Sequence, residues 1–330
     1  MPKISILARV QSLQPQFKKI FIFLDTEKHA SPFDILTVMD TLPEAVIIKY
    51  EDVTAEDTEK ILYDAMFPRG PEGAKHTKIF INGRNFELAN EILARVKKCM
   101  FPPFELAVII DPSGAYSTAS AAVAKTLKIL LERNWGTLKN KKVTVLAGTG
   151  PVGQTAAKLY ASEKADVTIT SRNLQKAESL ATKINEELNT TSVQALQAQT
   201  SQEIGEAIEK AEIILSAGAG GTELLPLNTL KSSAKKCKIV ADVNAIPPLG
   251  VAGLDPEMDG EEMLPEVYGV GALAVGRLKN EIEISLIRKA ADEPKGIFDY
   301  KITYELAKIS IIKKDDNKKI VVEPHKSWLP

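Results

Sequence analysis

The amino-acid sequence predicts an α/β fold built as two domains, and two observations predict it. Short apolar runs rich in β-branched residues alternate with helical segments through the first 115 residues, with short connections between them. This alternation is typical of a mostly parallel sheet covered by helices. Residues 141–153 then join an apolar run to a glycine turn and a helical segment, which begins a second unit of the same kind. At 330 residues the chain is long enough for two separate cores.

The first domain is expected to span residues 1–125, of which 1–17 form an N-terminal extension without a clear period. Ser31 with Pro32 and Asp34 has the pattern of a helix start, and Thr54 opens a second helix that runs to about Phe67. Further helices are expected at 86–99 and 117–132, strands at 19–24, 45–49, 78–81 and 106–110, and a loop at 68–73. The result is a parallel-rich α/β domain.

The second domain is expected to span residues 126–290 as a doubly wound sheet. Strands are expected at 143–147, 167–170, 193–196, 212–216 and 238–242, and helices at 154–162, 173–188, 201–210 and 277–291. Residues 268–276 are glycine-rich and apolar and lead into the last of these helices. Residues 291–330 are expected to add a helix at 298–309 that packs back on the N-terminal domain, followed by a charged tail with an apolar run at 320–322.

A glycine turn follows the strand expected at 143–147. Its Gly-x-Gly-x-x-Gly spacing, in the order strand, turn and helix, is that of a Rossmann dinucleotide-binding unit. The first glycine allows a tight turn, the second lets a pyrophosphate approach the backbone, and the third lets the helix pack close to the strand. The free N–H groups of the helix start favour an anion, and a proline suits its first position. The expected cofactor loop comprises Gly148, Thr149, Gly150, Pro151, Val152 and Gly153.

The end of the next strand predicts which nucleotide is bound. An acidic residue there would bind the ribose hydroxyls of NAD, but this chain has Ser171 and Arg172, with Lys176 one helical turn further on. The guanidinium of arginine suits a phosphate group. These residues favour NADP, with use of NAD also possible. The alternative is that Arg172 stacks on an adenine or faces solvent.

Other candidate ligand contacts lie where strands end, because ligands of open α/β sheets bind beyond the carboxyl ends of the strands. Ala217 and Gly218 follow the strand at 212–216 and would give the ribose and phosphates close backbone access. We expect an active-site cleft between the two domains. The polar candidates to face it are Asp25, Arg69, Asp111 and Ser113, although each also fits an ordinary turn.

Composition argues against several classes of function. A formal net charge of −1 gives no electrostatic case for binding nucleic acid or an anionic membrane. The two cysteines and three histidines are scattered, which argues against a disulfide framework or a metal site and fits a reducing cytoplasm. We expect no signal peptide, because Lys3 and Arg9 interrupt the apolar residues near the start, and no apolar run approaches the length of a membrane span.

The usual acid–base devices of dehydrogenases are missing from the expected ligand loops. An alcohol dehydrogenase needs a zinc site, a Tyr-x-x-x-Lys pair or a histidine paired with an acid to move a proton. Tyr160 and Lys164 have that spacing, but they lie at the far end of the helix after the glycine turn. We therefore expect a hydride donor whose oxidised product needs no proton removed.

Several loops together carry a resemblance to a known family. In the second half they are 145–153, 217–219, 223–226, 239–242, 244–245, 247–250, 271–273, 278–279 and 296–299; in the first half they are 21–25, 31–34 and 69–70. With these segments the chain resembles the NADP-dependent methylene-tetrahydromethanopterin dehydrogenases of one-carbon metabolism in methylotrophic bacteria. The resemblance runs from about residue 19 to 309 and is more specific in the second half.

The resemblance implies a reaction and a key residue. The family oxidises a methylene bridge between two nitrogens and passes a hydride to NADP, leaving a methenyl cation that needs no general base. Lys279 matches a family lysine proposed to lie near the site of hydride transfer. A cation beside a developing cation is unfavourable, so we expect Lys279 to orient the pterin through hydrogen bonds or to be neutral through desolvation. Asn244 could bond the nicotinamide or pterin amide. The family also implies a cytoplasmic homo-oligomer.

Three other functions are also compatible with the sequence. The pterin heads of folate and methanopterin are alike, so a methylene-tetrahydrofolate dehydrogenase is one. A hydride enzyme similar to shikimate dehydrogenase would need a lysine–aspartate pair in the first domain, where the sequence does not point to one. A sensor that binds NADP without catalysis is the third, and loss of Lys279 would not change any rate in it.

Overall fold

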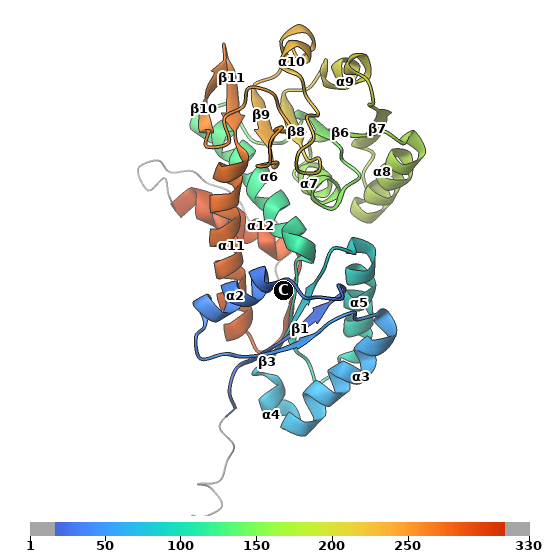
Figure 1. Cartoon of the computed structure of the whole chain (residues 1–330), viewed down its shortest axis with the longest axis vertical. Coiled ribbons are helices and arrows are strands. Elements are labelled where there is room, and N and C mark those ends of the chain that lie inside the picture. The colour runs from blue at the N-terminus through green and yellow to red at the C-terminus, as the bar shows by residue number, and fades with distance from the viewer. Residues whose placement is uncertain (1–16, 314–330) are drawn as a thin grey trace, which may run out of the picture. The chain divides into compact units, whose positions relative to one another are not determined.

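The computed structural model describes residues 17–313 of the chain (Figure 1). Within that range the contacts separate two compact units. The first holds residues up to Ile109 together with Ile287–Ile297, and the second holds Ile110–Leu286 together with the residues from Phe298 onward. The sequence placed the first boundary at 125 and the last at 290, so the contact boundaries lie earlier in the chain.

The first unit is built on a sheet with the strand order β12-β4-β3-β1-β2. Strand β1 pairs in parallel with both β2 and β3, as the alternation of strands and helices predicts. Its elements are β1 (Ile20–Asp25), α2 (Pro32–Thr41), β2 (Val46–Tyr50), α3 (Ala55–Met66), the 3₁₀ turn η1 (Phe67–Arg69), α4 (Gly70–Ala74), β3 (Thr77–Asn82), α5 (Phe86–Cys99), β4 (Ala107–Ile110) and β12 (Gly296–Phe298).

Local signals in the sequence set the helix starts of this unit. The Ser31 hydroxyl accepts a hydrogen bond from the Phe33 N–H at the start of α2. Thr54 and Asp57 form a reciprocal capping box at the start of α3. Strands β3 and β4 are buried throughout, because helices cover both faces of a central parallel strand.

The second unit is a Rossmann sheet. Its strand order is β10-β11-β9-β8-β5-β6-β7, which without β10 is the order 6-5-4-1-2-3 of a dinucleotide-binding fold. Its elements are η2 (Pro112–Gly114), α6 (Ala115–Glu132), β5 (Lys142–Leu146), α7 (Pro151–Ser162), β6 (Asp166–Ser171), α8 (Leu174–Leu188), β7 (Val193–Gln197), α9 (Ser201–Ile208), β8 (Ile213–Ser216), α10 (Leu227–Ser233), β9 (Ile239–Asp242), β10 (Asp259–Leu264), β11 (Val267–Val270), α11 (Ala272–Asp292) and α12 (Tyr300–Lys313). The residues of α11 from Ile287 onward belong to the first unit.

Helices cover both faces of this sheet. Helices α6, α7 and α12 pack against one another beside it (Figure 1). Helix α9 packs against α10, and together they cover a core that includes Leu146, Ile214 and Val240 from the strands. In this sheet the strand order reverses between the neighbouring strands β5 and β8. An open α/β sheet binds its ligand at such a point.

Four expectations differ from the structure. Residues 70–74, expected as loop, form the short helix α4 after η1, so Gly73 packs inside the unit and not in a loop. Residues 267–270 form β11, which pairs with the unpredicted antiparallel strand β10, and α11 begins at 272 and not at 277. Residues 296–298 form an edge strand, so α12 starts at 300. Short strands of this kind carry too few alternating residues to be distinguished from a loop.

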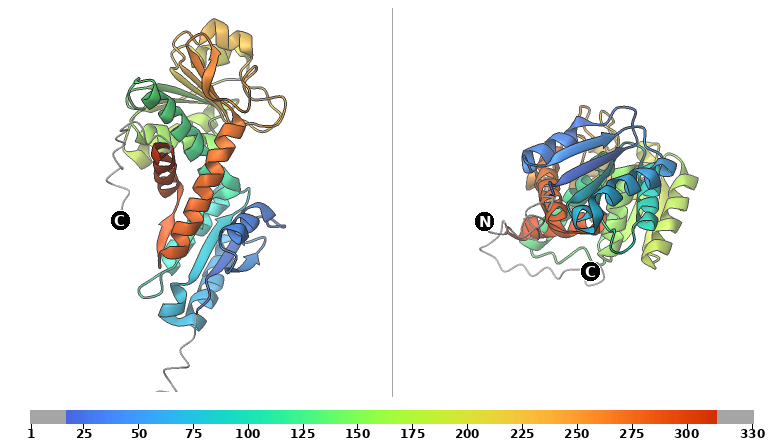
Figure 2. Two further views of the ribbon diagram at one scale, coloured as in Figure 1. Left: turned by 90° about the vertical axis from the view of Figure 1, so that its left-hand side faces the viewer. Right: turned by 90° about the horizontal axis from the view of Figure 1, so that it is seen from below.

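The last helix also packs differently from the expectation. We expected it to pack on the N-terminal domain, but α12 packs on α6 and α7 of the second unit. Its buried residues Tyr304, Ala307 and Ile311 lie on one face, and the alanines of α6 allow close approach. Helix α11 is one continuous helix of 21 residues (Figure 2).

Among residues 17–313, no helix combines the length and the apolar composition that crossing a bilayer requires. The expectations for residues 1–16 and for the apolar run at 320–322 lie outside the described residues.

Candidate functional site

The glycine turn connects β5 to α7, and its three glycines have different surroundings. A Cβ on Gly148 would lie 2.8 Å from the Ile169 Cβ, and one on Gly153 would lie 2.7 Å from the Gly148 Cα. A Cβ on Gly150 would meet nothing closer than 3.6 Å. Gly148 and Gly153 are therefore required by the packing of the turn against β6 and α7. Gly150 leaves an open surface.

The start of α7 has the properties of an anion site. Gly150 is the N-cap residue and has no side chain to accept hydrogen bonds from the first-turn N–H groups. Pro151 is the first residue of the helix, and Val152 and Gly153 complete its first turn. Helix starts of this kind bind phosphate groups, because uncapped N–H groups and the helix dipole act together.

A pocket of about 550 Å³ lies against this turn. It is lined from the ends of β5, β6 and β8, as the Rossmann topology predicts. Six of the expected site residues line it: Thr149, Gly150, Ser171, Arg172, Ala217 and Gly218. The structure thus brings together the glycine turn, the end of the second Rossmann strand and the small-residue loop after the fourth.

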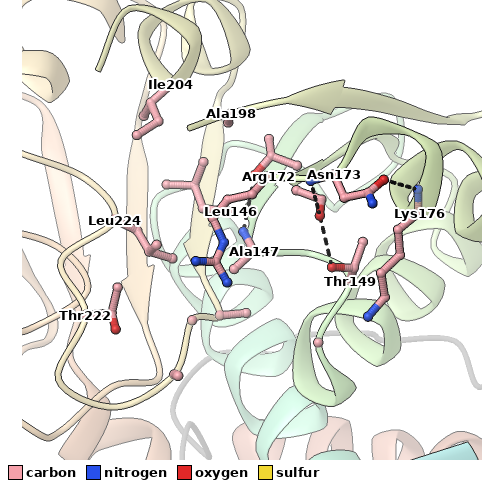
Figure 3. Close-up of a pocket in the computed structure, with 16 residues that line it drawn as sticks. Leu146, Ala147, Thr149, Arg172, Asn173, Lys176, Ala198, Ile204, Thr222 and Leu224 are labelled. Atoms are coloured by element: carbon pink, nitrogen blue, oxygen red, sulfur yellow. Dashed lines mark hydrogen bonds between the residues drawn. The ribbon is translucent and has the colours of Figure 1, made fainter. Parts of the chain in front are cut away.

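The charge of this pocket is positive. Arg172 and Lys176 both line it, and no aspartate or glutamate is among its lining residues. In Figure 3 the Arg172 side chain reaches into the space between Ala147 and Leu224. Within the described part of the chain, no carboxylate forms an ion pair with this guanidinium. The pocket therefore fits a dinucleotide that carries an additional phosphate.

Ser171 and Asn173 order the same end of the pocket. The Thr149 hydroxyl lies 3.4 Å from the Ser171 hydroxyl, which also accepts the Asn173 N–H at 3.2 Å. Asn173 caps α8 by accepting the Lys176 N–H at 3.0 Å (Figure 3). This cap fixes where α8 begins and hence where Lys176 projects.

Asn244 lies outside the lining of this pocket. It is buried, and its Oδ1 accepts the Ile246 N–H at 2.8 Å while its Nδ2 donates to the Pro248 carbonyl at 3.0 Å. The side chain therefore holds together the loop that follows β9. Sequence reasoning treated it as a ligand contact because a loop-internal amide and a ligand-binding amide look the same in sequence.

Two of the expected substrate residues also form hydrogen bonds within the first unit. Asp25 is buried and accepts the Glu27 N–H at 2.8 Å, and burial raises the pKa of its carboxyl group. The Arg69 guanidinium donates to the Thr77 hydroxyl and to the Lys18 carbonyl, both at 2.7 Å. Both side chains stabilise turns within the first unit.

Two other expected residues, Lys279 and Asp111, lie in one charged cluster. The Lys279 Nζ lies 2.6 Å from a carboxylate oxygen of Glu283. Asp111 accepts the Tyr116 N–H at 2.7 Å and the Ser117 N–H at 3.2 Å, which anchors the start of α6. Burial raises the pKa of Asp111 to about 6, although nearby Lys279 lowers it. Ser113 is exposed at the η2 turn with a φ of 48°, a conformation that non-glycine residues seldom adopt.

Two family models match the chain in succession. One, described as methylene-tetrahydromethanopterin dehydrogenase, N-terminal, matches residues 32–113, and one for shikimate / quinate 5-dehydrogenase matches residues 129–248. An NAD(P)-dependent methylenetetrahydromethanopterin dehydrogenase of Methylorubrum extorquens is 34% identical over 293 residues, covering 88% of this chain and 98% of that relative. The chain belongs to the methylenetetrahydromethanopterin dehydrogenase family.

A second relative matches a similar length of the chain. A bifunctional protein MdtA of the same organism is 34% identical over 295 residues, with 88% of this chain and 98% of that protein covered. As a member of the methylenetetrahydromethanopterin dehydrogenase family, the chain is an oxidoreductase. The match to the shikimate / quinate model covers the Rossmann half.

Two solved structures match most of the chain at much lower sequence identity. A shikimate dehydrogenase in complex with NADP+ is 16% identical with a TM-score of 0.45, and 92% of this chain and 98% of that chain are covered. A quinate dehydrogenase from Corynebacterium glutamicum in complex with NAD is 12% identical with a TM-score of 0.49, and 88% and 99% are covered.

Sequence reasoning missed Glu283. The signal for it was present, because Lys279 and Glu283 stand four residues apart in a helical segment and such pairs face each other. Pairs of that kind are common on solvated helix faces, so the spacing alone does not predict burial. Residues 17–313 hold no group of three or more histidine, cysteine, aspartate or glutamate residues arranged to bind a metal ion.

Proposed function

We propose that this protein oxidises the methylene bridge of methylene-tetrahydromethanopterin and passes the hydride to NADP+. The carbon between the two nitrogens loses a hydride and becomes a methenyl cation, while NADP+ becomes NADPH. Both electrons and the hydrogen are accounted for, and no proton has to be removed. The observation that carries the proposal is the glycine-turn pocket with two cations and no acid, in a chain of this family.

The residues at the pocket fit this cofactor. The start of α7, with Gly150 open to approach, would hold the pyrophosphate. Arg172 and Lys176 would hold the 2′-phosphate, and Ala217 with Gly218 would lie along the ribose and phosphates. NAD lacks the 2′-phosphate and would lose those contacts, so we expect it to be used less well. When bound, the cofactor supplies the hydride acceptor.

On the substrate side we propose Lys279 as the residue that contacts the pterin, with Asp111 and Ser113 beside it. The Glu283 carboxylate, 2.6 Å from the Lys279 Nζ, holds that group in place. From this position we expect the lysine to donate hydrogen bonds to the pterin. The remaining contribution of the protein is to hold the methylene carbon against the nicotinamide, which is catalysis by proximity.

The testing experiment mixes purified protein, NADP+ and methylene-tetrahydromethanopterin and follows NADPH absorbance, with NAD+ and methylene-tetrahydrofolate in parallel. We expect turnover with the methanopterin and NADP+. Faster turnover with the folate would assign the protein to the other pterin. Binding of NADP+ without turnover of either pterin would reject the dehydrogenase and leave a cofactor-binding sensor.

We also infer that the protein assembles with copies of itself in the cytoplasm. Both described cysteines are free and buried, which fits a reducing compartment. Strand β2 is at an edge of its sheet, and Val46, Ile48 and Tyr50 on one of its faces are each about 40% exposed. Antiparallel pairing of two copies about Ile48 would set Val46 of each against Tyr50 of the other.

A further inference from the structure

Lys279, Asp111 and Glu283 form a cluster in which two carboxylates surround one lysine, so the negative charge exceeds what one ammonium group can neutralise. Asp111 and Glu283 are 0% and 1% exposed, and the Lys279 side chain is 14% exposed. One oxygen of each carboxylate, Asp111 Oδ2 and Glu283 Oε1, is buried without a hydrogen-bond partner in the described structure. Buried carboxylates are costly unless they are paired, so such an excess calls for a functional explanation.

The geometry also fixes where the lysine chain can lie. Gly114 has a φ of +69°, and a Cβ on it would lie 3.0 Å from the Lys279 Cε and 3.4 Å from its Nζ. The lysine stem therefore passes over the η2 turn at the one residue without a side chain. At the other end, Glu283 lies one helical turn further along α11 and holds the Nζ.

We propose that Glu283 is a positioning residue for hydride transfer, and that with Asp111 it gives the cluster around Lys279 a net negative charge. Two carboxylates and one ammonium sum to −1. The ammonium can then orient the pterin while the cluster as a whole favours positive charge beside it. This inference rests on the proposed function, because it needs a substrate that becomes a cation.

The chemistry explains why such a cluster would speed the reaction. The methylene substrate carries no charge at the reacting carbon, and the carbon gains positive charge as the hydride leaves. A field that favours positive charge stabilises the transition state and the methenyl product more than the substrate. A lysine without neighbouring carboxylates would destabilise the transition state relative to the substrate. The two buried carboxylates thus remove the electrostatic disadvantage of a lysine at this position.

The key experiment compares Glu283→Gln with the wild type on two ligands that differ in charge. We expect kcat with methylene-tetrahydromethanopterin to fall about tenfold or more, equivalent to about 1.4 kcal/mol, with KM changed less than about twofold. Affinity for the methenyl cation, measured by fluorescence titration without cofactor, should fall by a similar factor. A residue that only stabilises the fold would not distinguish a cationic from a neutral pterin.

A second buried ion pair supplies the matched control. Lys308 pairs with Glu163 at 3.1 Å and with Glu305 at 2.8 Å, and its side chain is 3% exposed, so like Lys279 it lies beside two carboxylates. Glu163→Gln removes a carboxylate from a buried lysine elsewhere in the same unit. We expect it to lower the unfolding temperature while leaving kcat and the ratio of methenyl to methylene affinity unchanged.

The outcomes separate this inference from the proposed function. If the wild type turns over the methanopterin and Glu283→Gln keeps both its kcat and its affinity for the cation, the inference is wrong and the proposed function stands. If the wild type turns over neither pterin, both fail together. Should Glu283→Gln not fold, Glu283→Asp keeps the charge but withdraws it from Lys279. It should lower kcat and retain cation affinity, and loss of both would overturn the inference.

Discussion

The Nζ of Lys279 lies 2.6 Å from a carboxylate oxygen of Glu283, four residues further along α11, and the carboxylate is buried. This pair connects the residue that the family resemblance identified with one that the sequence did not. It also changes the electrostatic problem of the site, because a lysine beside a developing cation is tolerable once buried carboxylates outnumber it.

Arg172 should determine the preference for NADP. Replacing it with alanine removes a charge-assisted contact to the 2′-phosphate, which is worth about 1.5–3 kcal/mol. We expect KM for NADP+ to rise by about tenfold or more, while KM for NAD+ stays nearly constant. Lys183→Ala, on the exposed surface of the helix α8 that follows Arg172, is the control and should change neither value. Equal losses with both cofactors would show that Arg172 does not contact the phosphate.

Two glycines of the same turn should respond differently to alanine. Gly148→Ala places a Cβ 2.8 Å from the Ile169 Cβ, and overpacking of this kind costs about 1–3 kcal/mol. Gly150→Ala meets nothing closer than 3.6 Å, so the free energy of unfolding should change little. It should instead weaken cofactor binding by obstructing the pyrophosphate. Urea unfolding and cofactor titration of both variants test this, and a stable Gly148→Ala with normal affinity would contradict it.

Asp111 should make stability depend on pH. Burial raises its pKa to about 6 from the usual 3.8, so the folded state binds the proton more tightly than the unfolded state does. Its contribution is therefore fully present below about pH 4 and is lost as pH rises through about 6, by at most about 3 kcal/mol. The charged groups that face it are Lys279 and Glu283 of α11, and Ser117 of α6 supplies a hydroxyl.

The measurement is urea unfolding of the wild type and Asp111→Asn between pH 4.5 and 7.5. The destabilisation caused by the substitution should be larger at the acidic end, because there the wild type has its protonated, stabilised carboxyl group. Turnover should also fall below about pH 6, as one negative charge of the cluster is lost. The same pH dependence in both proteins would rule out Asp111 as its source.

Ile48 should control self-association. It lies at the centre of the exposed face of β2, and a lysine there would place two like charges opposite each other in the proposed antiparallel pair. Light scattering of the wild type should give an oligomer, and Ile48→Lys should give a smaller species. Leu273→Lys, at a residue 43% exposed in the second unit, is the control. A wild type that is monomeric at micromolar concentration would overturn the proposal.

Much of the Rossmann unit could be predicted because its signals are local. The glycine turn, the caps at Ser31 and Thr54 and the apolar runs of the central strands are set by neighbouring residues. The absence of an acid at the end of β6, with Arg172 and Lys176 in its place, is equally local, and the structure places both in one pocket. The sequence did not predict the pairing of β10 with β11, because both strands are short. It did not predict the pairing of β4 with β12, because the two strands are far apart in the chain.

The roles of polar residues were decided by the tertiary structure. Asn244, Asp25 and Arg69 are candidate ligand contacts in sequence, and in the folded chain their polar atoms form hydrogen bonds to other protein groups. Glu283 looks like a surface partner of Lys279, yet it is buried. The sequence by itself determined where the cofactor turn lies and which charges stand beside it, since spacing along the chain sets both. Which carboxylates face Lys279 depends on the packing of the η2 turn against α11, and Asp111 and Lys279, 168 positions apart in the sequence, meet only when the chain folds.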